Sequence, residues 1–248
     1  MPVPEDNQSP WTRDFAAADE GAPLLVCFPH AGGSAAYFRP LAQAVAPGVR
    51  TLAVQYPGRQ DRRHEPLLES VPALAEAAFE ALRPELAGPF AFFGHSLGAV
   101  VAFEVARRFE QLTAQGPARL FTSARRAPSV VREERVHLLD DAGLLTELGR
   151  LGGTDTAVLA DADLRALVLP VVRADYRAVE TYRAAPGTRV TCPVTVFVGD
   201  ADPVTAVSDA AAWEGHTTKG ADVQVFQGGH FYLDRHTAAV ASAIAAAI

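Results

Sequence analysis

Short apolar runs alternate with segments of helical periodicity along most of the chain. The run Leu24–Phe28 is continuous, which is typical of a strand buried on both faces of a sheet, and Thr51–Gln55 and Phe90–Phe93 are the next two predicted strands. Between the runs, apolar residues recur every three or four positions, as in helices that pack one face on a sheet. The same pattern predicts a short edge strand and three later strands, at Trp11–Phe15, Leu120–Ser123, Val194–Val198 and Val223–Phe226.

One segment breaks this rhythm. From Glu133 to Arg183 the apolar residues keep helical spacing, and no strand pattern appears. Elsewhere strands alternate with helices, which predicts an α/β fold with a mainly parallel central sheet and helices on both faces. We therefore expect a single domain over residues 1–248, with a helical insertion at about 133–183. In such sheets, functional side chains collect at the carboxyl ends of the strands.

Composition and charge exclude several classes of protein. The 248 residues carry a formal net charge of -7, whereas nucleic-acid-binding domains show a basic face or stripe. No apolar run approaches the ~20 residues that a membrane helix needs, and no secretory signal is visible at the N-terminus. Cys27 and Cys192 stand in or beside apolar runs, as expected of buried thiols in a reducing compartment. We expect a cytoplasmic monomer that binds neither nucleic acid nor membrane.

The segment Gly94–Gly98 (GHSLG) matches the G-x-S-x-G pattern of serine hydrolases. It follows a predicted strand directly and precedes a helical pattern that starts at Leu97, which is the context that this motif requires. Such a turn lifts the serine hydroxyl above the sheet, and the two glycines leave room for the crowded backbone. The motif predicts an α/β-hydrolase fold in which Ser96 is the nucleophile.

A serine hydroxyl needs a neighbouring base, and in this fold the triad follows the order Ser, Asp or Glu, His. His230 comes after the last predicted strand, on a loop where two glycines directly precede it, and we predict that it is the base. His137 and His216 have no comparable loop, and His236 falls in the final helix.

Two aspartates compete for the role of the acid that orients the histidine. Asp200 and Asp202 both follow the strand predicted at Val194–Val198. The spacing Gly-x-x-Asp before a proline is usual in this fold and favours Asp202. Asp200 would then be a loop residue or a turn cap. The acid holds the imidazole in the correct tautomer and stabilises its charged form.

The tetrahedral intermediate of acyl transfer needs two aligned N–H donors. We predict that the backbone of Leu97 supplies one, because it follows the nucleophile. The loop after the strand Leu24–Phe28 supplies the second in this fold, and Ala31 is our choice there, with Gly32 as the alternative. His30 and His95 are expected to brace these turns. No metal or cofactor is required.

Further motifs accompany the serine motif, from about Trp11 to the C-terminus: Phe28–Ser34 (FPHAGGS), Gln55–Arg59 (QYPGR), Leu120–Pro128 (LFTSARRAP), Arg173–Tyr176 (RADY), Glu180–Tyr182 (ETY) and Gly228–Tyr232 (GGHFY). Together they resemble the type II thioesterases, the free-standing editing enzymes of polyketide and nonribosomal peptide synthases. Tyr56, where a leucine is common, is a small variation.

The resemblance implies a substrate and a partner. The substrate would be an aberrant or stalled acyl group on the phosphopantetheine arm of an acyl or peptidyl carrier protein, and the insertion would be a lid over the acyl chamber. Because carrier proteins are usually acidic, a local basic rim on this acidic chain is a further hypothesis. Its candidates are Arg59, Arg62, Arg63, Arg125 and Arg126.

Two other functions compete with this interpretation. An esterase or lipase that acts on small diffusible esters would use the same triad. A hydrolase fold retained as a binding module typically loses a member of the triad, whereas all three stand here in order. The acyl preference, the partner synthase and the docking surface are not readable from the sequence.

Overall fold

A seven-stranded sheet forms the centre of the computed structural model, which describes residues 9–113, 115–153 and 161–248. The strands lie in the order β1-β3-β2-β4-β5-β6-β7, and all neighbours pair in parallel except β1 with β3. The edge strand β1 is thus antiparallel. The strands are β1 (Thr12–Asp14), β2 (Leu24–Phe28), β3 (Arg50–Val54), β4 (Phe90–His95), β5 (Arg119–Ser123), β6 (Val194–Gly199) and β7 (Ala221–Phe226).

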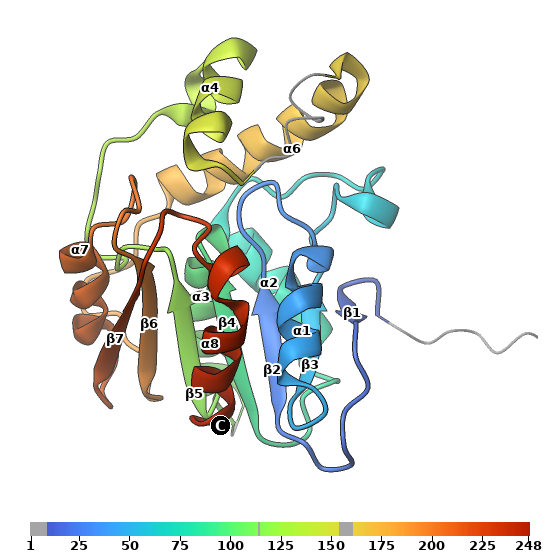
Figure 1. Cartoon of the computed structure of the whole chain (residues 1–248), viewed down its shortest axis with the longest axis vertical. Coiled ribbons are helices and arrows are strands. Elements are labelled where there is room, and N and C mark those ends of the chain that lie inside the picture. The colour runs from blue at the N-terminus through green and yellow to red at the C-terminus, as the bar shows by residue number, and fades with distance from the viewer. Residues whose placement is uncertain (1–8, 114, 154–160) are drawn as a thin grey trace, which may run out of the picture.

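Helices cover both faces of this sheet. Figure 1 shows α1 and α8 on one face and α2 and α3 on the other. The α-helices are α1 (Arg39–Val45), α2 (Val71–Leu82), α3 (Leu97–Leu112), α4 (Asp141–Leu151), α6 (Ala162–Thr181), α7 (Val207–Ala211) and α8 (Leu233–Ala245). Short 3-10 turns are η1 (Ala35–Phe38), η2 (Gln60–Arg62), η3 (Val136–Leu138) and η4 (Ala212–His216). The predicted fold class is confirmed.

The apolar runs are continuous because both faces of the central strands are covered. In β4, Phe92 joins the core cluster under α2 and α3, while its neighbour Phe93 joins the cluster under α1 and α8. Successive side chains of a strand point to opposite faces, so each face must receive an apolar residue. The start of α2 also follows from the sequence, because serine is a favoured N-cap residue. The Ser70 hydroxyl caps the helix by accepting from the Ala73 N–H at 3.3 Å.

The segment predicted as an insertion crosses one end of the sheet. There α4 and α6 lie above the strands (Figure 1) and share a small apolar cluster, formed by Leu144, Leu148, Leu169 and Val172. Leu138, within the stretch of helical spacing predicted from Glu133 to Arg183, lies outside α4 in the turn η3 and is exposed. Residues 154–160 of this segment lie outside the described residues, as do residues 1–8 of the N-terminal tail.

No helix within the described ranges combines the length and the apolar character that a membrane crossing requires.

Candidate active site

Ser96 stands on a tight turn between β4 and α3. Its backbone has φ 55° and ψ -114°, a region that side-chain-bearing residues rarely adopt. The Ser96 N–H donates to the Ser123 carbonyl at 2.8 Å and ties the turn to β5. A Cβ on Gly98 would lie 1.9 Å from the Phe28 carbonyl oxygen, and one on Gly94 would lie 2.2 Å from the Gly98 carbonyl oxygen. The glycines therefore allow three backbone segments to meet beneath the serine.

The structure brings together the three side chains predicted as a triad. His230 Nε2 lies 3.0 Å from Ser96 Oγ, and His230 Nδ1 lies 2.9 Å from Asp202 Oδ2. The imidazole and the carboxylate are almost completely buried, with 4% and 0% of their side chains exposed. With Nδ1–H donated to the carboxylate, Nε2 is left as the acceptor for the serine proton.

The loop after β6 separates the roles of its two aspartates. The Oδ1 atom of Asp202 accepts from the backbone N–H groups of Val204 and Thr205, at 2.9 and 3.2 Å, which fixes the carboxylate against His230. Asp200 instead accepts from the Gly228 N–H at 2.8 Å. Asp200 thus braces the loop that carries the histidine, and the geometry favours Asp202 as the orienting acid.

The oxyanion loop, which we define as His30–Gly33, carries the predicted second donor. The Gly32 N–H already donates to Asp175 Oδ2 at 2.7 Å. Because the Gly32 N–H already has an acceptor, the geometry favours Ala31 as the donor. Both residues line the same cavity as Ser96 and His230. The donor roles of Ala31 and Leu97 stay predictions.

His30 and His95 are packed in aromatic surroundings behind the triad. His30 makes edge-to-face contacts with Tyr37, His95 and Phe231, with ring centroids 4.5 to 5.8 Å apart. Burial, followed by repulsion from His230 and Arg59, lowers the pKa of His30 to about 3. Burial also lowers the pKa of His95. Both rings are neutral at physiological pH, in agreement with a bracing role.

A hydrogen-bonded chain behind the nucleophile was not predicted. His95 Nδ1 lies 2.9 Å from Ser123 Oγ, which in turn lies 2.6 Å from the Tyr232 hydroxyl. His95 and Ser123 are the last residues of β4 and β5, and Tyr232 precedes α8, so the chain joins two strand ends to the loop that carries His230. Ser123 and Tyr232 belong to the motifs LFTSARRAP and GGHFY, which were the available signal.

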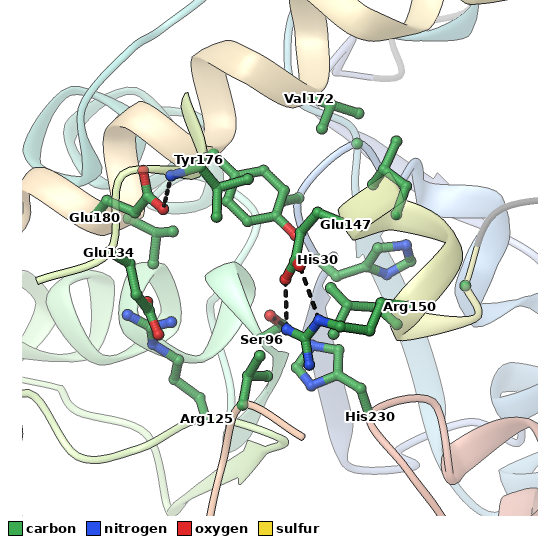
Figure 2. Close-up of a pocket in the computed structure, with 18 of the residues that line it drawn as sticks. His30, Ser96, Arg125, Glu134, Glu147, Arg150, Val172, Tyr176, Glu180 and His230 are labelled. Carbon is green, nitrogen blue, oxygen red and sulfur yellow. Dashed lines mark hydrogen bonds and ion pairs between the residues drawn. The ribbon is translucent and has the colours of Figure 1, made fainter. Parts of the chain in front are cut away.

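A cavity of about 430 Å³ lies between the triad and the helices α4 and α6. Figure 2 shows Ser96 and His230 at its floor, Tyr176 reaching in from α6, and the ion pair of Glu147 with Arg150 above the serine. We call this cavity the chamber. Its apolar wall consists mainly of Val136, Leu148, Leu151, Val168, Val172 and Val179. The chamber therefore offers apolar surface next to a hydroxyl that can be deprotonated.

The hypothesis of a basic rim is wrong for Arg59 and Arg62. Arg59 is 4% exposed and forms a buried ion pair with Asp175. Arg62 is 6% exposed, lies 4.3 Å from the ring centre of Trp11 and pairs with Glu65. Both guanidinium groups are therefore engaged in contacts within the protein. The residue type alone does not show whether an arginine is buried in this way.

Of the remaining candidates, two also face inward. Arg126 is 5% exposed and pairs with Glu134 in the chamber wall. Arg125 lines the chamber, and burial lowers its pKa to about 9. Only Arg63 among the five is exposed, so these residues do not form a continuous positive surface.

A mainly parallel sheet with a serine on a strained turn after β4, and an acid and a histidine after β6 and β7, defines an α/β-hydrolase. The chain belongs to the thioesterase family, because the family model for the thioesterase domain matches residues 23–248.

Relatives and solved structures agree with this assignment. The chain is 50% identical over 225 residues to the thioesterase PikA5 of Streptomyces venezuelae, covering 90% of this chain and 80% of that one. It is 46% identical over 244 residues to a probable cadicidin biosynthesis thioesterase of Streptomyces griseus, covering 98% and 67%. The type II thioesterase BorB from the borrelidin biosynthetic cluster superposes with a TM-score of 0.89 at 47% identity, covering 96% and 97%. The predicted resemblance to type II thioesterases, and with it a hydrolase that acts on thioesters, is confirmed.

Proposed function

We propose that this chain hydrolyses acyl thioesters on the phosphopantetheine arm of acyl or peptidyl carrier proteins in polyketide or nonribosomal peptide biosynthesis. Stalled or aberrant acyl groups would be removed and the arm freed for another cycle. The proposal is supported by structurally similar proteins that come from NRPS/PKS (nonribosomal peptide and polyketide synthase) pathways, and by the chamber above Ser96. The observation that carries it is the 3.0 Å contact between His230 Nε2 and Ser96 Oγ.

The proposed chemistry follows from the positions of the side chains. Ser96 Oγ attacks the thioester carbonyl while His230 Nε2 takes the hydroxyl proton, and Asp202 stabilises the imidazolium that forms. The N–H groups of Leu97 and Ala31 hold the oxyanion. Collapse of the intermediate expels the pantetheine sulfur, which receives the proton from His230 and leaves as a thiol. A thiol with a pKa of ~8.5 is a better leaving group than an alcohol.

Deacylation repeats these steps with water. His230 removes a proton from a water molecule, the hydroxide attacks the acyl-serine carbonyl, and the proton returns to Ser96 as the free acid leaves. Every proton is accounted for by one imidazole, and the step needs no further reactant. We propose that residues 133–183 act as the lid of a single catalytic domain, and that the chain works as a monomer, which light scattering would test.

The experiment that tests the function compares two substrates with the same acyl group. One is a propionyl group on a carrier protein, and the other is a soluble propionyl ester. We expect kcat/KM to be at least tenfold higher for the carrier thioester, about the effect of ~1.4 kcal/mol of additional transition-state binding. Equal values, or a preference for the ester, would favour the esterase instead.

A further inference from the structure

A buried carboxylate joins the lid helix to the oxyanion loop. Asp175 stands in α6 and is 0% exposed. Its Oδ2 atom accepts from the Gly32 N–H at 2.7 Å and from the guanidinium of Arg59. Arg59 in turn donates to the Pro57 carbonyl at 2.6 Å. One carboxylate thus connects α6, the oxyanion loop and the loop after β3.

A second contact links the same helix to the same glycine. Val172 lies one helical turn before Asp175, and a Cβ on Gly32 would be 2.7 Å from Val172 Cγ2. Gly32 has φ +75°, a conformation that glycine adopts without strain. The helix therefore packs directly on the backbone of the oxyanion loop. The preceding residue in the chain is Ala31, whose N–H is the proposed oxyanion donor.

The triad does not explain this arrangement. Arg59 belongs to the motif QYPGR and Asp175 to the motif RADY, and among the described residues neither is hydrogen-bonded to Ser96, His230 or Asp202. Burying an ion pair is costly unless good geometry and further hydrogen bonds compensate, and apolar residues of similar volume often serve as well for stability alone. A role in positioning explains why the carboxylate points at a backbone amide of the catalytic loop.

We propose that Asp175 is a positioning residue for catalysis. By holding the Gly32 amide from α6, it sets the direction of the neighbouring Ala31 N–H toward the oxyanion. The oxyanion hole is then complete only when α6 is seated on the loop, so the lid helix is part of the catalytic machinery. This inference rests on the proposed function, because it assumes that Ala31 stabilises a tetrahedral intermediate.

Two double variants isolate the hydrogen bond to Gly32. Both carry Arg59→Leu, so that no buried cation is left unpaired. One adds Asp175→Leu and the other Asp175→Asn. Leucine and asparagine have similar shapes, but only asparagine retains an oxygen that can accept from the Gly32 N–H. Removing one oxyanion donor costs about 10²- to 10³-fold in kcat, and we expect misalignment to cost part of this.

We expect the leucine variant to lose about 10- to 100-fold in kcat with little change in KM, and the asparagine variant to recover most of that loss. Arg177→Gln is the matched control, since it removes an exposed ion pair between α6 and Glu69 outside the chamber. The control should behave like wild type. Equal kcat values for the leucine and asparagine variants, or a loss confined to KM, would overturn the proposal.

Inhibitor affinities separate positioning from general loosening of the structure. A trifluoromethyl ketone analogue of acyl-pantetheine forms a tetrahedral adduct with serine, whereas a thioether analogue binds without an oxyanion. The leucine variant should bind only the ketone more weakly than wild type does. An equal loss of affinity for the ketone and the thioether would contradict the proposal. Should leucine at 175 prevent folding, Asp175→Ser replaces it in the same background, because its side chain is too short to reach Gly32.

Competition with a fluorophosphonate probe at Ser96 gives both affinities without using a carrier protein. A wild-type chain that fails to hydrolyse carrier thioesters but shows the expected inhibitor pattern would contradict the proposed function and leave the role of Asp175 standing.

Discussion

Ser96 and His230 illustrate how much of this site depends on single side chains held in one conformation. The serine has positive φ on a turn fixed by β5, and the imidazole is buried between the serine and a carboxylate with both of its oxygens engaged. Groups that must not reorganise during the reaction are thus fixed beforehand by packing and by hydrogen bonds.

The two aspartates of one loop give a matched test of the acid. Asp202→Asn removes the charge that stabilises the imidazolium and favours the wrong tautomer, and we expect kcat to fall about 10³- to 10⁴-fold. Asp200→Asn, two residues away, keeps an oxygen for the Gly228 N–H and should leave kcat near the wild-type value. Steady-state kinetics with an acyl thioester measures both, and a larger loss for Asp200→Asn would reverse the assignment.

The lowered pKa of His30 predicts that the stability of the protein depends on pH. Its pKa is lowered to about 3 in the folded chain, so the unfolded chain binds more protons between about pH 6.5 and 3. The neutral ring contributes stability that is present above the unfolded pKa and is lost as pH falls toward the folded pKa. Wild type should therefore lose up to ~1.4 kcal/mol more per pH unit than His30→Gln in this window. Urea unfolding at several pH values measures the difference, and parallel curves would contradict it.

At the scale of elements, the nucleophile turn depends on close backbone packing between β2, β4 and α3. A methyl group on Gly98 would lie 1.9 Å from the Phe28 carbonyl oxygen, where no flexible side chain can yield. We expect Gly98→Ala to lower the free energy of unfolding by about 2 kcal/mol or more. Gly149→Ala in α4 is the control, because nothing lies within 4 Å and alanine should stabilise the helix by ~0.5–1 kcal/mol. Urea denaturation of both variants would show whether these signs are right.

The elements themselves were largely predictable from the sequence. Continuous apolar runs located the central strands because both faces of the sheet are covered, and the serine motif fixed one strand end. The Gly-x-x-Asp spacing and the loop after the last strand selected the residues that the structure brings to Ser96. These signals are local, so a sequence displays them directly.

Long-range partners were not predictable in the same way. The buried state of Arg59 and Arg62 depends on Asp175 and Trp11, which are distant in the sequence. An arginine on a charged loop therefore suggested a surface role that the fold excludes. The hydrogen bond between Ser123 and His95 could not be predicted either, because it depends on which strands are neighbours in the sheet.

At the scale of the whole molecule, α4 and α6 line the chamber, and we propose that its size sets the acyl preference. Val168 in α6 lines the chamber, so Val168→Phe should reduce the space for the acyl chain. We expect kcat/KM for octanoyl thioesters to fall about tenfold more than for acetyl thioesters, since each displaced methylene weakens binding. Val207→Phe on the exposed face of α7 is the control. Equal effects on both acyl lengths would place the acyl chain elsewhere.

Mass spectrometry of a carrier protein loaded with an acyl-phosphopantetheine arm shows directly whether Ser96 performs the thioester hydrolysis. With wild-type enzyme, the carrier should lose the acyl mass and regain a free thiol, while Ser96→Ala should leave the acyl group in place over the same time. Removal of the acyl group at the wild-type rate by Ser96→Ala would contradict the account, because the contact between His230 and Ser96 would then not be the source of the activity.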